Sequence, residues 1–174
     1  MRRGAEELKA RLSNGAFKHG APSRLCLDVA DAISQSMGGT SGALLELAFR
    51  SCGNVLSQRQ EGGNKATTEA DWRVGFEAGV KAIQYYGGAT VGYRTMVDAL
   101  EPARIACASG ETAANIVAAA KAGAEATKGM AALAGRSNYV PRELLVGVPD
   151  PGAVAVVVAL EKLLAGFGVV GGAV

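Results

Sequence analysis

The sequence is poor in the residue types that build metal centres and hydrolytic active sites. It holds a single histidine, His19, which nearly excludes a histidine metal cluster or a Ser-His-Asp triad with a spare base. Its three cysteines lie far apart in the chain and form no CxxC pair, so a structural zinc site is not expected. We interpret these cysteines as reduced, mostly buried thiols of a cytoplasmic protein.

Net charge and long apolar runs are also limited. The 174 residues carry a formal charge of +2, and no segment concentrates the basic residues, so a nucleic-acid partner is not expected. The N-terminal residues lack the apolar run of a signal peptide. The apolar segment 153–174 is interrupted by Glu161 and Lys162, whereas a membrane span needs about 20 mostly apolar residues. We therefore expect no membrane segment, and instead a buried last helix followed by a loose tail.

Apolar residues at helical spacing dominate the chain. Leu45, Phe49, Cys52 and Leu56 share one helical face, and no segment shows the period-2 alternation of a strand. The predicted helices cover residues 5–12, 23–34, 41–57, 69–87, 95–107, 112–133 and 151–167. Aromatic residues make up only 5 %, and abundant alanine and glycine suit helices that pack closely. No repeat or linker divides the chain, so the sequence predicts a single all-α domain over residues 1–174.

Capping signals mark the ends of several predicted helices. Ser23 is expected to cap one helix start, and Asp150-Pro151 reads as a cap followed by proline at the first helical position. The segment Thr68–Asp71 resembles a capping box. The pair Gly87-Gly88 is expected to end its helix by adopting the left-handed conformation. Within the helix 95–107, Ile105 is expected to point inward.

Helix starts at two places could bind phosphate. The segment Met37–Gly42 reads MGGTSG immediately before a helix, where unpaired N–H groups and the positive dipole end attract anions. Taken alone, the segment is more simply interpreted as a flexible turn with a serine cap. The segment Asp150–Ala153 also lies at a helix start, and an ordinary N-cap is its alternative interpretation.

Two further junctions complete the set of candidate binding segments. Gly92–Met96 leads into a helix, and Met96 could line the slot of a flat ring, with core packing as the alternative. Gly135–Tyr139 follows the alanine-rich helix, and Arg136 could hold a phosphate with two hydrogen bonds or could be a solvated loop residue. If the helices run up and down, alternate loops meet at one end, where helix starts could together hold a polyphosphate.

The motifs MGGTSGALLEL, YYGGATVGYRTMVDALEPA, AEATKGMAALAGRSNYV and DPGAVAVVVALEKLL occur in this order. Together they resemble the C-terminal, L-type nucleotide-binding domain of ATP-dependent dihydroxyacetone kinases, including the triokinase type. The related L subunit of the phosphoenolpyruvate-dependent enzyme is similar too. The resemblance spans residues 2–167 and implies an antiparallel barrel of amphipathic helices with the nucleotide at one end.

The resemblance also implies a set of nucleotide-binding residues. Thr40 and Ser41 match the hydroxyl pair at the phosphates, and the other matching positions are Gly38, Gly39, Gly87, Thr95, Met96, Asp150, Pro151, Gly152 and Arg136. The motif around Arg136 departs from the Gly-Arg-Ala-Ser-Tyr common in relatives. The family's leading helix and its aspartate loop for two Mg²⁺ ions have no counterpart in the sequence. We therefore expect no metal ligands here, although the family uses ATP or ADP with Mg²⁺, and we assign no catalytic residue.

The implied function is ATP-dependent phosphorylation of dihydroxyacetone (glycerone), with glyceraldehyde as a further candidate substrate. The implied partner is a substrate-binding dihydroxyacetone kinase domain in the same or another chain, and a homodimer is a further candidate. Because the metal loop is missing, we expect an incomplete domain, and inactivity of the isolated chain stays open. The alternatives are the ADP-binding L subunit of a phosphoenolpyruvate-dependent kinase and a non-catalytic helical interaction module.

Overall fold

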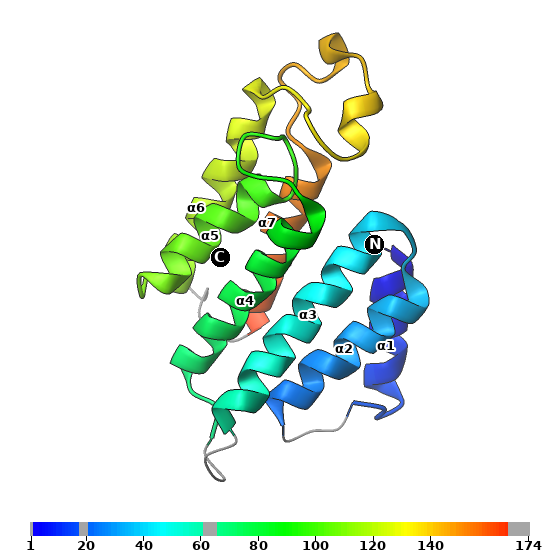
Figure 1. Ribbon diagram of the computed structural model, residues 1–174, viewed down its shortest axis with the longest axis vertical. Coiled ribbons are helices and arrows are strands. Elements are labelled where there is room, and N and C mark those ends of the chain that lie inside the picture. Colours follow the sequence, from blue (N-terminus) through cyan, green and yellow to red (C-terminus); the bar gives the residue numbers. More distant parts are fainter. Residues whose placement is uncertain (1, 18–20, 61–65, 167–174) are drawn as a thin grey trace. The chain divides into compact units, whose positions relative to one another are not determined.

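The computed structural model describes residues 2–17, 21–60 and 66–166, and it divides the chain into two compact units. Unit 1 comprises residues 1–88 and unit 2 residues 89–174. All regular elements in the described ranges are helices, which confirms the all-α prediction (Figure 1). His19 and the end of the last predicted helix, at Phe167, lie outside the described residues.

Unit 1 consists of consecutive helices, each packed against the next along the chain (Figure 1). They are α1 (Arg2–Ser13), α2 (Pro22–Ser36), α3 (Gly39–Gln60) and α4 (Glu69–Gly87). The contact between α3 and α4 is close at Gly79, where an added Cβ would lie 3.1 Å from the carbonyl oxygen of Ala48. The buried apolar side chains of the four helices include Cys26, Ala30, Ile33, Leu56, Val80 and Ile83.

Unit 2 is built around three mutually packed helices and a long connection with short 3-10 turns. The elements are α5 (Val97–Ala108), α6 (Ala113–Ala126), η1 (Thr127–Gly129), η2 (Arg136–Tyr139), η3 (Arg142–Leu144) and α7 (Pro151–Gly166). Small residues dominate its core, which includes Val97, Ala99, Ala103, Val117, Ala120, Ala124, Ala153 and Val157. The α5–α6 crossing is so close that a Cβ at Gly123 would overlap the carbonyl oxygen of Asp98.

The capping signals predicted at Thr68–Asp71, at the end of α4 and at Asp150 are confirmed. The Thr68 side chain accepts a hydrogen bond from the Asp71 N–H, and the Asp71 carboxylate accepts one from the Thr68 N–H, which is a complete capping box. Gly88 ends α4 in the left-handed conformation, with φ 64°. Asp150 caps α7 by accepting a hydrogen bond from the Ala153 N–H at 3.0 Å.

Several predicted helix boundaries are wrong. The start of α2 is Pro22, because proline suits the first helical position, and Ser23 is not the cap. The helix α3 begins at Gly39 rather than residue 41 and continues to Gln60 rather than ending at residue 57. The predicted helix 112–133 ends at Ala126, where the chain tightens into η1.

The inward position predicted for Ile105 is also wrong, since its side chain is 52 % exposed.

The cysteines carry free thiols, and Cys26 and Cys107 are buried. Among the helices that lie in the described ranges, none combines the length and apolar character needed to cross a bilayer.

Candidate functional site

The start of α3 presents an exposed turn of small and hydroxyl residues in unit 1. The residues Gly38 to Ser41 are all exposed. Gly39 has φ 75°, a conformation that favours glycine. One turn further, Gly42 is buried, because the chain entering α3 at Met37 lies tightly against it. A Cβ at Gly42 would overlap the backbone of Met37. The first N–H groups of a helix have no partner within it, and this turn can therefore present them to an anion.

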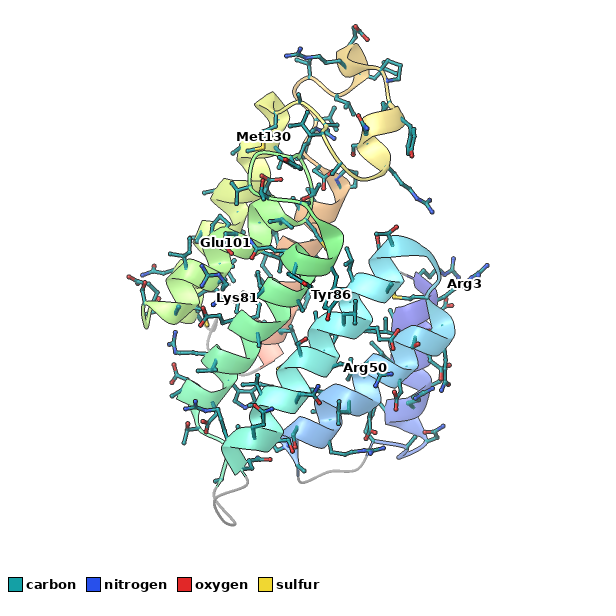
Figure 2. All side chains as sticks on the ribbon, viewed as in Figure 1. Arg3, Arg50, Lys81, Tyr86, Glu101 and Met130 are labelled. Atoms are coloured by element: carbon teal, nitrogen blue, oxygen red, sulfur yellow. The ribbon has the colours of Figure 1, made fainter. Side chains whose placement is uncertain are left out.

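The C-terminal end of α4 lies beside the same part of α3. Gly87 is exposed, and an added Cβ there would lie 3.1 Å from the Cδ1 atom of Leu44, one helical turn after Thr40. The preceding residues Tyr85 and Tyr86 are also exposed, and their rings meet edge to face with their centroids 5.0 Å apart. Tyr86 is labelled on α4 in Figure 2. Unit 1 thus brings Gly87 close to the first turns of α3, with an aromatic pair beside it.

In unit 2, Asp150 is the centre of a buried hydrogen-bond group at the start of α7. Besides capping the helix, its carboxylate accepts a hydrogen bond from the Ser137 hydroxyl at 3.1 Å. Its backbone N–H donates to the Thr127 hydroxyl oxygen at 2.7 Å. Asp150 is 5 % exposed and Thr127 is fully buried, so these bonds are shielded from water. The segment Asp150–Gly152 is therefore held firmly in place.

The loop before α5 is fixed by a second buried carboxylate, Asp98. Its oxygens accept hydrogen bonds from the Gly92 N–H at 2.5 Å and the Thr95 N–H at 2.7 Å. The Thr95 hydroxyl in turn accepts a hydrogen bond from the Val97 N–H at 3.2 Å. Asp98 is 1 % exposed. Because both of its oxygens are used by the backbone, Asp98 shapes this loop rather than facing a ligand.

Arg94 lies in the same loop and is buried completely. It is 1 % exposed and has φ 59°, the left-handed region that non-glycine residues rarely adopt. Its Nη2 donates to the carbonyl oxygen of Val148 at 2.9 Å, and its Nη1 lies 3.8 Å from a carboxylate oxygen of Asp150. Its Nε and Nη1 atoms have no hydrogen-bond partner. The guanidinium thus spans from the loop before α5 to the chain entering α7.

Two of the three predicted binding segments of unit 2, Gly92–Met96 and Asp150–Ala153, are in contact. An added Cβ at Gly152 would lie 3.3 Å from the backbone nitrogen of Met96 and 2.9 Å from a carboxylate oxygen of Asp150. Arg136 is exposed on η2, directly before Ser137, which bonds to Asp150. Unit 2 therefore brings together its predicted residues, which are Thr95, Met96, Arg136, Asp150, Pro151 and Gly152. The remaining predicted residues, Gly38, Gly39, Thr40, Ser41 and Gly87, belong to unit 1.

The buried residues that shape this region were not predicted from the sequence. They are Arg94, Asp98 and Thr127, and the half-buried Ser137 joins them. The Thr95–Asp98 spacing is that of a capping box, so this signal could have identified Asp98. No local signal distinguishes Thr127 or Arg94, because their partners lie 23 and 54 residues further along the chain.

The acidic residues of the described part of the chain do not form a metal centre. No group of three or more His, Cys, Asp or Glu side chains lies together within the described ranges. In unit 2, Asp98 and Asp150 use their oxygens on backbone and hydroxyl donors, as described above. These residues do not fit a bound Mg²⁺ ion, and we derive no step through a metal.

An open hollow of unit 2 is separate from the predicted residues. It measures about 510 Å³ and lies beside α5, and its lining is mainly apolar. The lining residues are Val91, Glu101, Pro102, Ile105, Ala106, Ser109, Glu111 and Ala119. None of the predicted nucleotide-binding residues is among them, so we place the candidate site at the helix starts rather than in this hollow.

Comparisons with known proteins agree on one family. The sequence model of a protein family, the "DAK2 domain", matches residues 1–165 of this chain. Dihydroxyacetone kinase 2 of Saccharomyces cerevisiae is 34 % identical over 171 residues, which cover 94 % of this chain and 28 % of the yeast protein. Triokinase/FMN cyclase of Bos taurus is 36 % identical over 168 residues, which cover 89 % of this chain and 28 % of the bovine protein. The chain therefore spans little more than a quarter of these relatives.

The fold also matches a solved structure. The crystal structure of the native dihydroxyacetone kinase of C. freundii aligns with a TM-score of 0.70 and 28 % sequence identity. The same kinase in complex with AMP-PNP and Mg²⁺ aligns with a TM-score of 0.68. Each alignment covers 94 % of this chain and 27 % of the kinase. The all-helical fold is thus shared with part of a kinase that has been crystallised with a nucleotide analogue.

Proposed function

The chain belongs to the DAK2 domain family, and from this premise we propose that it is the L-type nucleotide-binding domain of an ATP-dependent dihydroxyacetone kinase. Both units would belong to this single domain. The family match extends over both units, which supports this assignment. The observation that carries the proposal is the contact between Met96 and Gly152, because it joins two of the three binding segments predicted for unit 2.

Each binding segment has a role that follows from its chemistry. The exposed start of α3 would bind phosphate oxygens through its N–H groups and through the hydroxyls of Thr40 and Ser41. Gly87 lets α4 approach Leu44 closely, which places the end of α4 beside the proposed phosphate-binding turn. In unit 2, the thioether of Met96 would lie against the flat base. Arg136 would add positive charge for phosphate, and the α7 start, which the Asp150 carboxylate already caps, would form the rim of the site.

The proposed reaction transfers the γ-phosphoryl group of ATP to a hydroxyl oxygen of dihydroxyacetone, and ADP is the leaving group. Glyceraldehyde offers the same kind of hydroxyl group and is a further substrate in the proposal. The ketone would be held by a substrate-binding domain in the same or another chain. The residues of this chain would position the nucleotide and stabilise the charge on its phosphates, which is the main protein contribution in phosphoryl transfer.

The test is calorimetric titration of the 174-residue chain with ATP and ADP, with and without Mg²⁺. The matched variants are Ser41→Ala and Ser57→Ala, because both serines are exposed on α3 and only Ser41 lies at its start. A hydrogen bond to a charged group contributes about 1.5–3 kcal/mol, so Ser41→Ala should weaken binding about tenfold or more. Ser57→Ala should leave the affinity unchanged.

The outcomes separate the parts of the proposal. A folded chain that binds neither nucleotide would refute it, and equal affinities of the two variants would remove the α3 start from the site. An assay of ADP release with dihydroxyacetone or glyceraldehyde then tests the substrate class. Retention of ADP without exchange for ATP would instead support the phosphoenolpyruvate-linked type.

A further inference from the structure

Arg94 is the largest fully buried side chain in the described residues, and its burial is only partly compensated. One hydrogen bond, to the carbonyl oxygen of Val148, is present at 2.9 Å. The nearest carboxylate oxygen, on Asp150, is 3.8 Å from Nη1, and Nε and Nη1 have no hydrogen-bond partner. Taking a charged group out of water in this way is unfavourable unless it is fully paired. The left-handed backbone at Arg94 adds strain.

Core packing does not explain this arrangement. Apolar residues of similar volume often replace buried charged groups without loss of stability, and sometimes with a gain. A methionine or leucine could fill the same space without a buried charge. Strained backbone and incompletely paired charge tend to occur where function requires a particular geometry. Arg94 therefore calls for an explanation other than stability.

The contacts of Arg94 show which two segments it connects. Its guanidinium reaches the chain at Val148 and Asp150, immediately before α7. Its own backbone lies directly before Thr95 and Met96, in the loop that Asp98 holds. Arg94 is thus a crosslink between the two segments that meet where Gly152 approaches the Met96 nitrogen.

We infer that Arg94 is a positioning residue that holds Thr95–Met96 against Asp150–Gly152 and so sets the affinity for the nucleotide. This inference rests on the proposed function, because the nucleotide is the ligand whose binding would depend on the two segments. Arg94 itself does not touch the ligand in this assignment. It fixes the relative position of backbone groups that would.

The test compares Arg94→Met and Arg94→Lys in the full chain with the control Val117→Ala. Val117 is a buried core residue of α6, away from the loop before α5, and its truncation removes packing only. The measurements are thermal unfolding, ADP affinity by calorimetry, and amide hydrogen exchange at Thr95 and Ala153, whose N–H groups bond to Asp98 and Asp150, in the ligand-free chain.

Arg94→Met should unfold cooperatively, exchange faster at both amides, and bind ADP at least about fivefold more weakly, the lower end of typical coupling between sites. Arg94→Lys should recover part of the ADP affinity, because lysine keeps the positive charge but has one donor nitrogen in place of the planar guanidinium group. Val117→Ala should lower the unfolding temperature and leave the ADP affinity unchanged. If Arg94→Met does not fold, Arg94→Lys compared with Val117→Ala gives the same test.

Unchanged ADP affinity in a folded Arg94 variant would overturn the inference, whatever its unfolding temperature. Equal weakening of ADP binding by Val117→Ala would also overturn it, because affinity would then follow stability alone. Absence of ADP binding by the unaltered chain would refute the proposed function. In that case the exchange of the Thr95 and Ala153 amides in the ligand-free variants would still decide whether Arg94 holds the two segments together.

Discussion

Replacing Thr127 by valine should destabilise the start of α7 by a predictable amount. The Thr127 side chain is fully buried. Its hydroxyl donates to the carbonyl oxygen of Ala124 at 2.5 Å and accepts from the Asp150 N–H at 2.7 Å. Valine has nearly the same shape but neither hydrogen bond. The substitution therefore removes the bonds without opening a cavity.

The dominant cost is the Asp150 N–H, which would be left buried without an acceptor. Such a group costs about 1–3 kcal/mol. Taking about 2 kcal/mol as the central value, a chain of this length should lose roughly 4–8 °C in its unfolding temperature. Thr127→Ser keeps the hydroxyl and loses one methyl group, which costs about 0.8 kcal/mol. The expected order of stability is therefore threonine, then serine, then valine.

Urea unfolding gives the free energies, and amide hydrogen exchange at Asp150 gives the local effect. The Asp150 amide should exchange slowly in the threonine and serine proteins and faster in the valine protein, because only valine removes its acceptor. A valine protein that is as stable as the serine protein and retains slow exchange at Asp150 would refute the assignment of this hydrogen bond.

Further predictions concern packing, the site and pH. Gly123→Ala should cost about 1–3 kcal/mol in urea unfolding through overpacking at the α5–α6 crossing, whereas Gly129→Ala should be nearly neutral because a Cβ there meets no atom within 4 Å. Gly152→Ala should weaken ADP binding in calorimetry while the fold persists, because the new Cβ would lie 2.9 Å from the carboxylate that caps α7. The Arg59 guanidinium holds the pKa of Asp71 below its ordinary value. The stability that this carboxylate contributes is therefore fully present above the unfolded pKa of about 3.9. It is lost as the pH falls through the lower folded pKa. Asp71→Asn should therefore flatten the acid limb of a melting-temperature profile, and an unchanged limb would contradict this.

The features predicted correctly from the sequence are those whose causes are local. The Thr68–Asp71 capping box and the Asp150 cap need only residues within one helical turn, so their spacing is enough to identify them. The left-handed Gly88 is likewise a property of one residue. The segments proposed for phosphate were chosen because every helix start has unpaired N–H groups, and their binding role stays a prediction.

The features that were missed depend on contacts between distant residues. The helix after Thr112 looks continuous in alanine-rich sequence, but it ends at Ala126 because the Thr127 hydroxyl is used by its own helix and by Asp150. The exposure of Ile105 depends on which faces of α5 are covered by α6 and α7. The burial of Arg94 is the clearest case, since arginine is rarely buried and nothing in its sequence surroundings indicates it.

The hydrogen bond from Asp150 to Thr127 also closes a loop. Together with the bond from the Gly147 N–H to the Lys128 carbonyl oxygen at 3.2 Å, it ties the two ends of the segment 128–149 to each other. The entropy lost on closing a loop grows only with the logarithm of its length, so each doubling costs only about 0.6 kcal/mol. Insertions in the middle of this segment should therefore leave both anchors intact, and variation in chain length among related proteins can be accommodated here without moving α7.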